Sequence, residues 1–112
     1  MRKVKKPWGF EEHLAVNEKV TVKILHVSPR RRFSLQRHRH RNEFWKVLSP
    51  CRVWIGRRKV AAKVGDEFFI KKGVLHRIEG FSKVGRVLEI SFGKFDDKDI
   101  VRVKDDYGRA GK

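Results

Sequence analysis

The chain has 112 residues, enough for one globular domain and too few for two, so we predict a single domain over 1–112. Hydrophobic residues make up 39% and aromatic residues 11% of it, which excludes an intrinsically disordered protein. Lys and Arg number 29 against 13 Asp and Glu, a formal net charge of +16 that favours polyanions or phosphorylated small molecules as partners.

Cys51 is the only cysteine, so the chain can form neither an intramolecular disulfide nor a thiolate zinc site. Basic residues at the N-terminus lead directly into Pro7, Trp8 and Gly9 without an apolar segment, and no run of about 18 apolar residues follows. We therefore expect a soluble cytoplasmic protein that does not bind membranes.

Short apolar runs separated by glycine and proline predict β-strands along almost the whole chain. In chain order they are 20–27, 44–48, 52–55, 59–64, 67–70 and 87–92. No long amphipathic helix is predicted, and the spacing of the breaks is typical of a small all-β barrel of short antiparallel strands. After Gly93 the composition becomes acidic, which suggests a C-terminal extension packed outside the barrel.

The segment 33–43 holds the densest set of candidate metal ligands. In an extended strand Gln36, His38 and His40 share one face, with successive side chains about 6.6 Å apart. Glu43 lies an odd number of residues after His38, so in an extended strand its side chain would point to the opposite face. It joins the other candidates only if the chain bends at 41–42. His76, at the start of a later predicted strand, is the obvious distant ligand, and imidazoles with one carboxylate suit iron, manganese, nickel or zinc. The alternative is that these are surface histidines of an arginine-rich strand.

Several motifs in the same order resemble one family over nearly the whole chain. The matching segments are 6–11, 34–45, 73–78, 99–102 and 106–109. Together they resemble the small cupin of type II mannose-6-phosphate isomerases, which often forms the C-terminal part of mannose-1-phosphate guanylyltransferases. The resemblance implies an antiparallel jelly-roll barrel with a short C-terminal extension. It also implies isomerisation of mannose 6-phosphate and fructose 6-phosphate through an enediol.

The same resemblance implies one divalent metal ion, either Zn, Mn, Fe or Ni. The general cupin pattern, counted back from Glu43, places its first two ligands at Gln36 and His38, with Gln in place of the usual first His. The second cupin pattern supplies His76. The implied metal ligands are therefore Gln36, His38, Glu43 and His76, with His40 close by.

The chain departs from the family pattern mainly at turns. Arg30 and Pro50 stand where the first pattern has Gly, Lys71 where the second has Pro, and Gly80 where it has Asn. These differences concern the strand connections rather than the metal ligands. Ser91 stands where the family commonly has Gln.

An aldose–ketose isomerase needs a base to move a proton between adjacent carbons and a Lewis acid on the oxygens. We expect His40 and Glu89 to be the catalytic groups, because His40 is predicted on the metal face and Glu89 points away from its apolar neighbours. The alternative is that His40 only hydrogen-bonds the site and Glu89 pairs with an arginine. A sugar phosphate also needs cationic side chains. The candidates are Arg41, Arg102, Arg109 and Lys72.

Other functions remain compatible with these residues. The cupin could bind a sugar phosphate or nucleotide sugar without turnover, or serve as the partner subunit of a separate guanylyltransferase. The same ligand set could support a metal-dependent oxygenase. The arginines of 30–41 point to nucleic-acid binding as a further alternative. Basic residues are spread along the whole chain rather than concentrated, however, so we expect no specific nucleic-acid site. Guanylyl transfer is not expected because no Gly-rich phosphate loop is present, and the family resemblance leads us to expect a homodimer.

Overall fold

The structure is a computed structural model that describes residues 2–111. Within this range the chain forms strands and no helix. The strands are β1 (Arg2–Lys6), β2 (Gly9–His13), β3 (Val20–Val27), β4 (Leu35–Arg37), β5 (Asn42–Ser49), β6 (Cys51–Ile55), β7 (Arg58–Ala62), β8 (Glu67–Ile70), β9 (His76–Gly80), β10 (Gly85–Phe92) and β11 (Val101–Lys104). The described part therefore has no helix that could cross a membrane.

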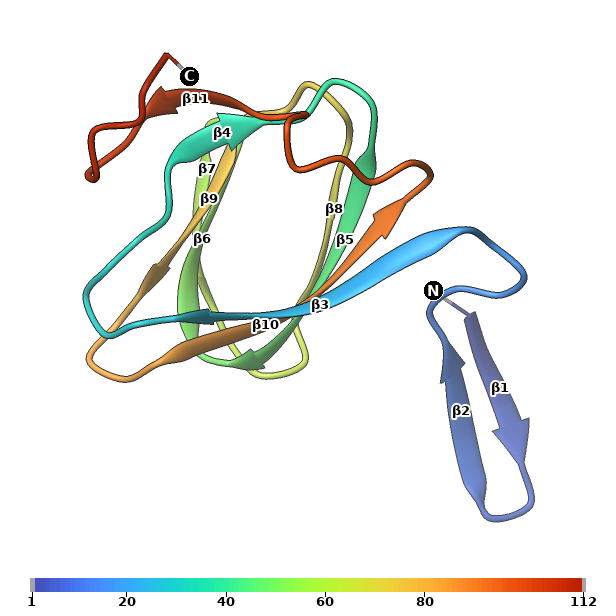
Figure 1. The fold of residues 1–112 in the computed structure, drawn as a ribbon. Coiled ribbons are helices and arrows are strands. Elements are labelled where there is room, and N and C mark those ends of the chain that lie inside the picture. The colour runs from blue at the N-terminus through green and yellow to red at the C-terminus, as the bar shows by residue number, and fades with distance from the viewer. Residues whose placement is uncertain (1, 112) are drawn as a thin grey trace.

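Two antiparallel sheets form opposite walls of the body, as Figure 1 shows. One wall has four strands in the order β3-β10-β5-β8, and the other has five in the order β11-β4-β9-β6-β7. The predicted all-β class is confirmed. Each apolar run of the sequence falls within or largely within one of these strands, because an apolar strand has at least one face to bury.

The inner faces of the two sheets are apolar at one end and polar at the other. The apolar end is filled by buried side chains from both walls, among them Val27, Val47, Val53, Ile78 and Val87. The same inward alternation continues along β5 and β10, but there it presents polar groups instead. The fold thus buries a polar cluster within a hydrophobic surround, where interactions between charges are strong.

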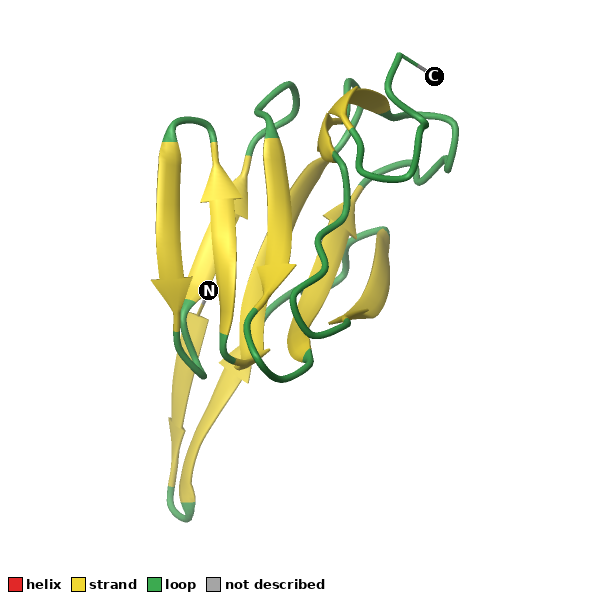
Figure 2. Cartoon of the chain, turned by 90° about the vertical axis from the view of Figure 1, so that its left-hand side faces the viewer, coloured by secondary structure: helices red, strands yellow, loops and turns green. Residues whose placement is uncertain are grey.

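The N-terminal hairpin of β1 and β2 was not expected from the sequence. It projects away from the sandwich in Figures 1 and 2. Trp8 and Phe10 keep 72% and 55% of their surface exposed on it. An ion pair of 2.6 Å between Glu12 and Lys46 of β5 joins the second hairpin strand to the body. The charged sequence of β1 carries no apolar alternation, which is why periodicity missed it.

The C-terminal segment departs from the expectation that it packs outside the barrel. Residues Val101–Lys104 pair with β4 and form the edge strand β11 of the five-stranded sheet. The preceding segment 93–100 crosses from one wall to the other. Its backbone and side chains contact the polar cluster, so it contributes to the site rather than to a separate appendage.

Candidate metal centre and active site

Three predicted ligands meet at the polar end of the sandwich. His38 follows the end of β4, Glu43 lies near the start of β5, and His76 begins β9. Residues 38–41 lie outside any strand, so the chain bends here. This is the bend that the sequence required for the Glu43 side chain to face the same way as His38. Ligand atoms of His38, Glu43 and His76 all lie within 4.8 Å of one another, and all three side chains are buried.

The distances between these atoms suit a common metal ion. Glu43 Oε1 lies 3.6 Å from His38 Nε2 and 3.3 Å from His76 Nε2. Ligand atoms that share one ion at bonds of about 2.1 Å lie roughly 3 to 3.5 Å apart. The three atoms therefore need only small shifts to bind one ion.

Backbone carbonyls set the tautomer of both histidines. His38 Nδ1 lies 2.6 Å from the carbonyl oxygen of Asp99, and His76 Nδ1 lies 2.9 Å from that of Val74. A carbonyl only accepts hydrogen bonds, so each Nδ1 carries the proton and donates it. Each Nε2 then has its lone pair directed at the cluster, which is the arrangement found behind metal-binding histidines.

Two buried atoms of the cluster lack a hydrogen-bond partner within the described chain. They are Glu43 Oε1 and His76 Nε2, which face each other at 3.3 Å. A buried carboxylate oxygen opposite an imidazole lone pair is costly unless a cation or proton lies between them. These orphaned atoms, with a donor set of two imidazoles and one carboxylate, fit a divalent transition metal.

The electrostatics keep the ligands in their metal-binding protonation states. Burial, with the positive charge of Arg41, lowers the pKa of His38 below 6.5, although Glu43 opposes this shift. Burial raises the pKa of Glu43, but contact with His76 and the positive charge of Arg41 outweigh it and hold that pKa below 4.5. His38 is therefore a neutral imidazole and Glu43 an anion at neutral pH.

Gln36, the other implied ligand, lies beside His76. The two residues pair across β4 and β9, so their side chains share the inner face. Ser34 Oγ donates a hydrogen bond of 2.6 Å to Gln36 Oε1. A second lone pair of that amide oxygen is left for another partner.

Glu89 lies next to the cluster on β10. It is 5% exposed, and Trp45 Nε1 donates a hydrogen bond of 3.1 Å to its Oε2. Burial, followed by the negative charge of Glu43, raises the pKa of Glu89 to about 7. Ser91 Oγ donates to Glu43 Oε2 at 3.3 Å, so the position that commonly holds Gln in the family contacts a candidate ligand directly.

His40 lies at the rim rather than among the ligands. β4 ends at Arg37, so strand alternation does not extend to His40, and its side chain is exposed. It lines a surface hollow of about 470 Å³ together with Lys94, Asp96 and Asp99. The Asp99 carboxylate accepts hydrogen bonds from the backbone N–H groups of Arg39 and His40, which fastens segment 93–100 over the buried cluster.

The four candidate phosphate ligands lie in different places. Arg102 pairs with Gln36 across β11 and β4 and shares its inner face. Arg41 reaches into the cluster, where its Nε donates to Glu43 Oε2 at 3.3 Å. Arg109 is exposed and pairs with Asp105 at 3.0 Å, and Lys72 is an exposed residue that follows β8.

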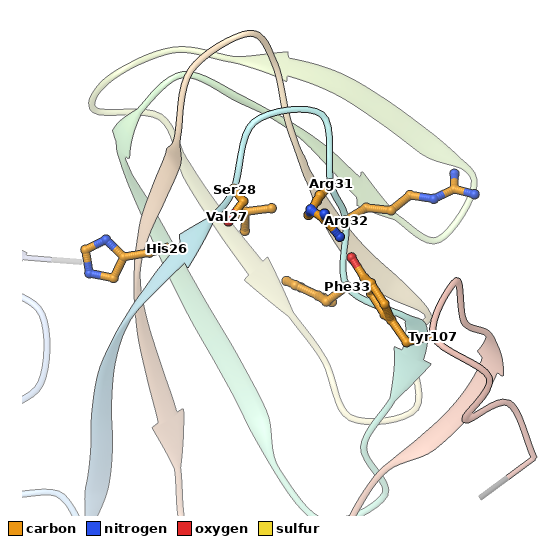
Figure 3. Close-up of a pocket in the computed structure, with 7 residues that line it drawn as sticks. All are labelled: His26, Val27, Ser28, Arg31, Arg32, Phe33 and Tyr107. Atoms are coloured by element: carbon orange, nitrogen blue, oxygen red, sulfur yellow. The ribbon is translucent and has the colours of Figure 1, made fainter.

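A second hollow, of about 200 Å³, lies apart from the predicted ligands (Figure 3). Its lining residues are His26, Val27, Ser28, Arg31, Arg32, Phe33 and Tyr107. Arg32 is already bound to Asp106 through two hydrogen bonds of 2.9 and 3.2 Å. None of the lining residues is a candidate metal ligand.

Comparison with known families identifies the family of this chain. A family model described as mannose-6-phosphate isomerase C-terminal matches residues 1–105. The chain belongs to this family. The predicted resemblance to the cupin of the mannose-6-phosphate isomerase family is thus confirmed.

Relatives of this cupin are longer proteins. It is 34% identical to the xanthan biosynthesis protein XanB of Xanthomonas campestris pv. campestris over 112 residues, covering 97% of this chain and 24% of XanB. It is 32% identical to a mannose-1-phosphate guanylyltransferase of Klebsiella pneumoniae, with the same two coverages. The chain therefore spans about a quarter of the length of these relatives.

A solved structure supports the fold independently. A Klebsiella pneumoniae protein with a double-stranded β-helix domain superposes with a TM-score of 0.60 at 21% identity, over 70% of each chain. This likeness shows a cupin fold, and the predicted fold class is confirmed.

Sequence reasoning missed several parts of the site. The carbonyls of Val74 and Asp99, which fix the histidine tautomers, carry no sequence signal because every residue has a carbonyl. Phe95, whose ring lies 4.6 Å from the Arg41 guanidinium carbon, sits in a segment without periodicity. Trp45, whose ring centroid lies 5.4 Å from that of His76, is not among them, because it lies two residues after Glu43 on β5 and strand alternation places both on one face.

Proposed function

We propose that this cupin is a metal-dependent sugar-phosphate isomerase that interconverts mannose 6-phosphate and fructose 6-phosphate. The observation that carries the proposal is the buried cluster of His38 Nε2, His76 Nε2 and Glu43 Oε1, with the Glu89 carboxyl beside it. A metal centre next to a carboxyl group supplies both parts that enediol chemistry needs. The names of the family and of its guanylyltransferase relatives support a mannose phosphate as the substrate.

His38, His76 and Glu43 would hold the ion, with Gln36 beside them. When bound, a divalent ion at this position polarises the carbonyl and hydroxyl oxygens of the sugar. Zinc, manganese, iron and nickel all accept this set of imidazole and carboxylate ligands.

Glu89 is the proposed base of the proton transfer. As a carboxylate it takes the proton from C2 of the open-chain aldose and returns it to C1, which yields the ketose. Trp45 orients Glu89 through the hydrogen bond to its Oε2. His40, exposed at the rim, is the candidate group for moving the proton that passes between the two sugar oxygens.

Arg102 is the proposed phosphate ligand. Of the four candidates it is the one that pairs with Gln36 on the inner face, whereas Arg41 bonds to Glu43. A guanidinium binds a phosphate with two parallel hydrogen bonds. We expect Arg102→Ala to raise KM for mannose 6-phosphate without changing the metal content.

The test is coupled conversion of mannose 6-phosphate to fructose 6-phosphate by purified, metal-analysed protein. His38→Ala is the test variant, and His26→Ala, at an exposed histidine outside the cluster, is the matched control. Turnover that is lost only in His38→Ala supports the proposal. Turnover that survives in His38→Ala contradicts it, and no turnover with a full complement of metal favours a cupin that binds a sugar phosphate without isomerising it.

A further inference from the structure

Arg41 occupies the candidate metal centre with its own positive charge. The side chain is 6% exposed, and three groups hold its guanidinium in addition to the Glu43 contact. Nη2 lies 3.2 Å from His38 Nε2, Nη1 donates to the carbonyl oxygen of Asp96 at 3.2 Å, and the ring of Phe95 lies 4.6 Å from the guanidinium carbon. The side chain is thus enclosed on several sides.

The contact with His38 uses the same lone pair that a metal ion would need. Because His38 Nδ1 donates to Asp99, Nε2 is the acceptor, and Arg41 Nη2 is the donor. An imidazole nitrogen has a single in-plane lone pair, so it cannot accept this hydrogen bond and bind an ion at once. Glu43 differs, because Arg41 bonds to Oε2 and leaves Oε1 facing His76.

Charge makes the competition stronger. A divalent ion bound to Glu43 Oε1 would lie within a few ångströms of a buried guanidinium, and like charges repel strongly where water is excluded. Meanwhile Arg41 supplies, in the metal-free protein, the positive charge that a buried carboxylate requires. The guanidinium and the ion therefore fulfil the same electrostatic role for Glu43.

We propose that Arg41 competes with the metal ion for this site: an ion binds only after displacing the guanidinium from His38 Nε2. Arg41 then sets the metal affinity of the cupin and protects the ligand atoms while no ion is bound. The inference rests on the metal centre of the proposed function but not on isomerase turnover. If the protein binds metal in competition with Arg41 but turns over no sugar phosphate, the proposed isomerase activity is contradicted and the proposed competition is not.

Titration of metal-stripped protein with Co²⁺, followed by calorimetry and by visible absorption, tests the proposal. The variant is Arg41→Gln, and Arg39→Gln is the control, because Arg39 is exposed and lies two residues away. Removing charge-assisted hydrogen bonds that the ion must break should tighten Co²⁺ binding by about 10- to 100-fold in Arg41→Gln. Arg39→Gln should stay within about threefold of wild type, as expected for an exposed charge.

Equal or weaker Co²⁺ binding by Arg41→Gln overturns the proposal, and so does an equal gain in Arg39→Gln, which would indicate a general charge effect. A second measurement follows Zn²⁺ binding in the wild-type protein itself. The side-chain Nε–H resonance of Arg41, identified by its absence from Arg41→Lys, should shift during titration with diamagnetic Zn²⁺ and saturate together with metal binding. A resonance that does not move while Zn²⁺ binds would show that Arg41 stays in place.

Discussion

Glu89 is the residue on which the proposed proton transfer depends most directly. We expect Glu89→Gln to lower kcat by at least about 100-fold, the usual contribution of a general base, while metal binding stays unchanged. The amide keeps the shape of the side chain and an oxygen for the hydrogen bond from Trp45. Steady-state kinetics on metal-analysed protein measure the effect, and a kcat within a few-fold of wild type would show that another group moves the proton.

Arg30 is a strained residue at a turn where the cupin pattern has glycine. Its φ is +59°, a left-handed conformation that costs a side-chain-bearing residue roughly 1–3 kcal/mol. Its N–H donates to the carbonyl oxygen of Phe81 at 2.8 Å, and that bond holds the turn. Glycine accepts this conformation without strain but loses about 0.5–1 kcal/mol of chain entropy on folding.

We therefore expect Arg30→Gly to stabilise the protein, raising Tm by roughly 2–5 °C. Arg31→Gly is the matched control, because Arg31 does not have a positive φ and glycine there should only add entropy to the unfolded chain. Thermal unfolding of both variants measures the difference. A lower Tm in Arg30→Gly than in Arg31→Gly would contradict the strain argument.

Gly80 shows why the turns could not be predicted from the family pattern alone. A Cβ on Gly80 would lie 2.5 Å from the carbonyl oxygen of Ser28, so the Asn of the pattern does not fit here. The Gly80 N–H donates to the Arg31 carbonyl at 2.9 Å, and the turn 28–31 packs directly onto β9. The departures at Arg30 and Gly80 thus belong to one altered connection, whose two parts lie far apart in the sequence.

The hairpin of β1 and β2 is the element that most needs a partner. An isolated two-stranded hairpin is only marginally stable in water. The outer face of the four-stranded sheet is also unusually apolar, since Val22, Ile24 and Phe69 keep 56%, 51% and 52% of their surface exposed. We propose that two copies associate through this face and the hairpin, which extends the homodimer expected from the family resemblance.

Size-exclusion chromatography with light scattering should give twice the mass of the chain. A charge at the centre of the apolar face, Ile24→Lys, should produce a monomer. Val64→Lys is the control, since Val64 is 66% exposed but lies outside the outer sheet face. A monomeric wild type, or a dimer that Ile24→Lys leaves intact, would contradict this arrangement.

Sequence alternation predicted the longer apolar strands and missed the charged or very short ones. β3, β5, β8 and β10 are rich in β-branched, aromatic and other apolar residues. β1 is highly charged and β4 has three residues, so neither shows a period. β11 lies in an acidic segment, and its place at the sheet edge depends on pairing with β4.

The candidate site was predictable where parity and the family pattern agreed. Parity required a bend before Glu43 and a distant ligand, and the chain supplies both at 38–41 and at His76. Parity failed for His40 because β4 ends before reaching it. The position of Arg41 against His38 and Glu43 had no sequence signal, since it depends on how a side chain in a bend is packed by Phe95 and Asp96.

In the molecule as a whole, the proposed metal centre would link ion binding to folding. His38 and Glu43 come from one part of the chain and His76 from another, so an ion bound by all three favours the folded state over the unfolded one. At free Zn²⁺ about 100 times Kd, the stabilisation should be about 2.7 kcal/mol, a rise in Tm of roughly 10 °C. Chelation by EDTA should reverse it.

Thermal unfolding of wild type and two histidine variants measures this linkage. His76→Ala should lose the Zn²⁺-dependent rise in Tm, whereas His26→Ala, at an exposed position, should retain it. A rise of the same size in His76→Ala would place the stabilising ion elsewhere on the molecule.

The most direct measurement of the central claim is anomalous diffraction from crystals of the wild-type protein grown with Zn²⁺. We expect one strong peak within about 2.1 Å of His38 Nε2, His76 Nε2 and a Glu43 carboxylate oxygen, with the Arg41 guanidinium moved away from His38. A structure with no peak at these atoms, and with Arg41 still bonded to His38 and Glu43, would contradict it.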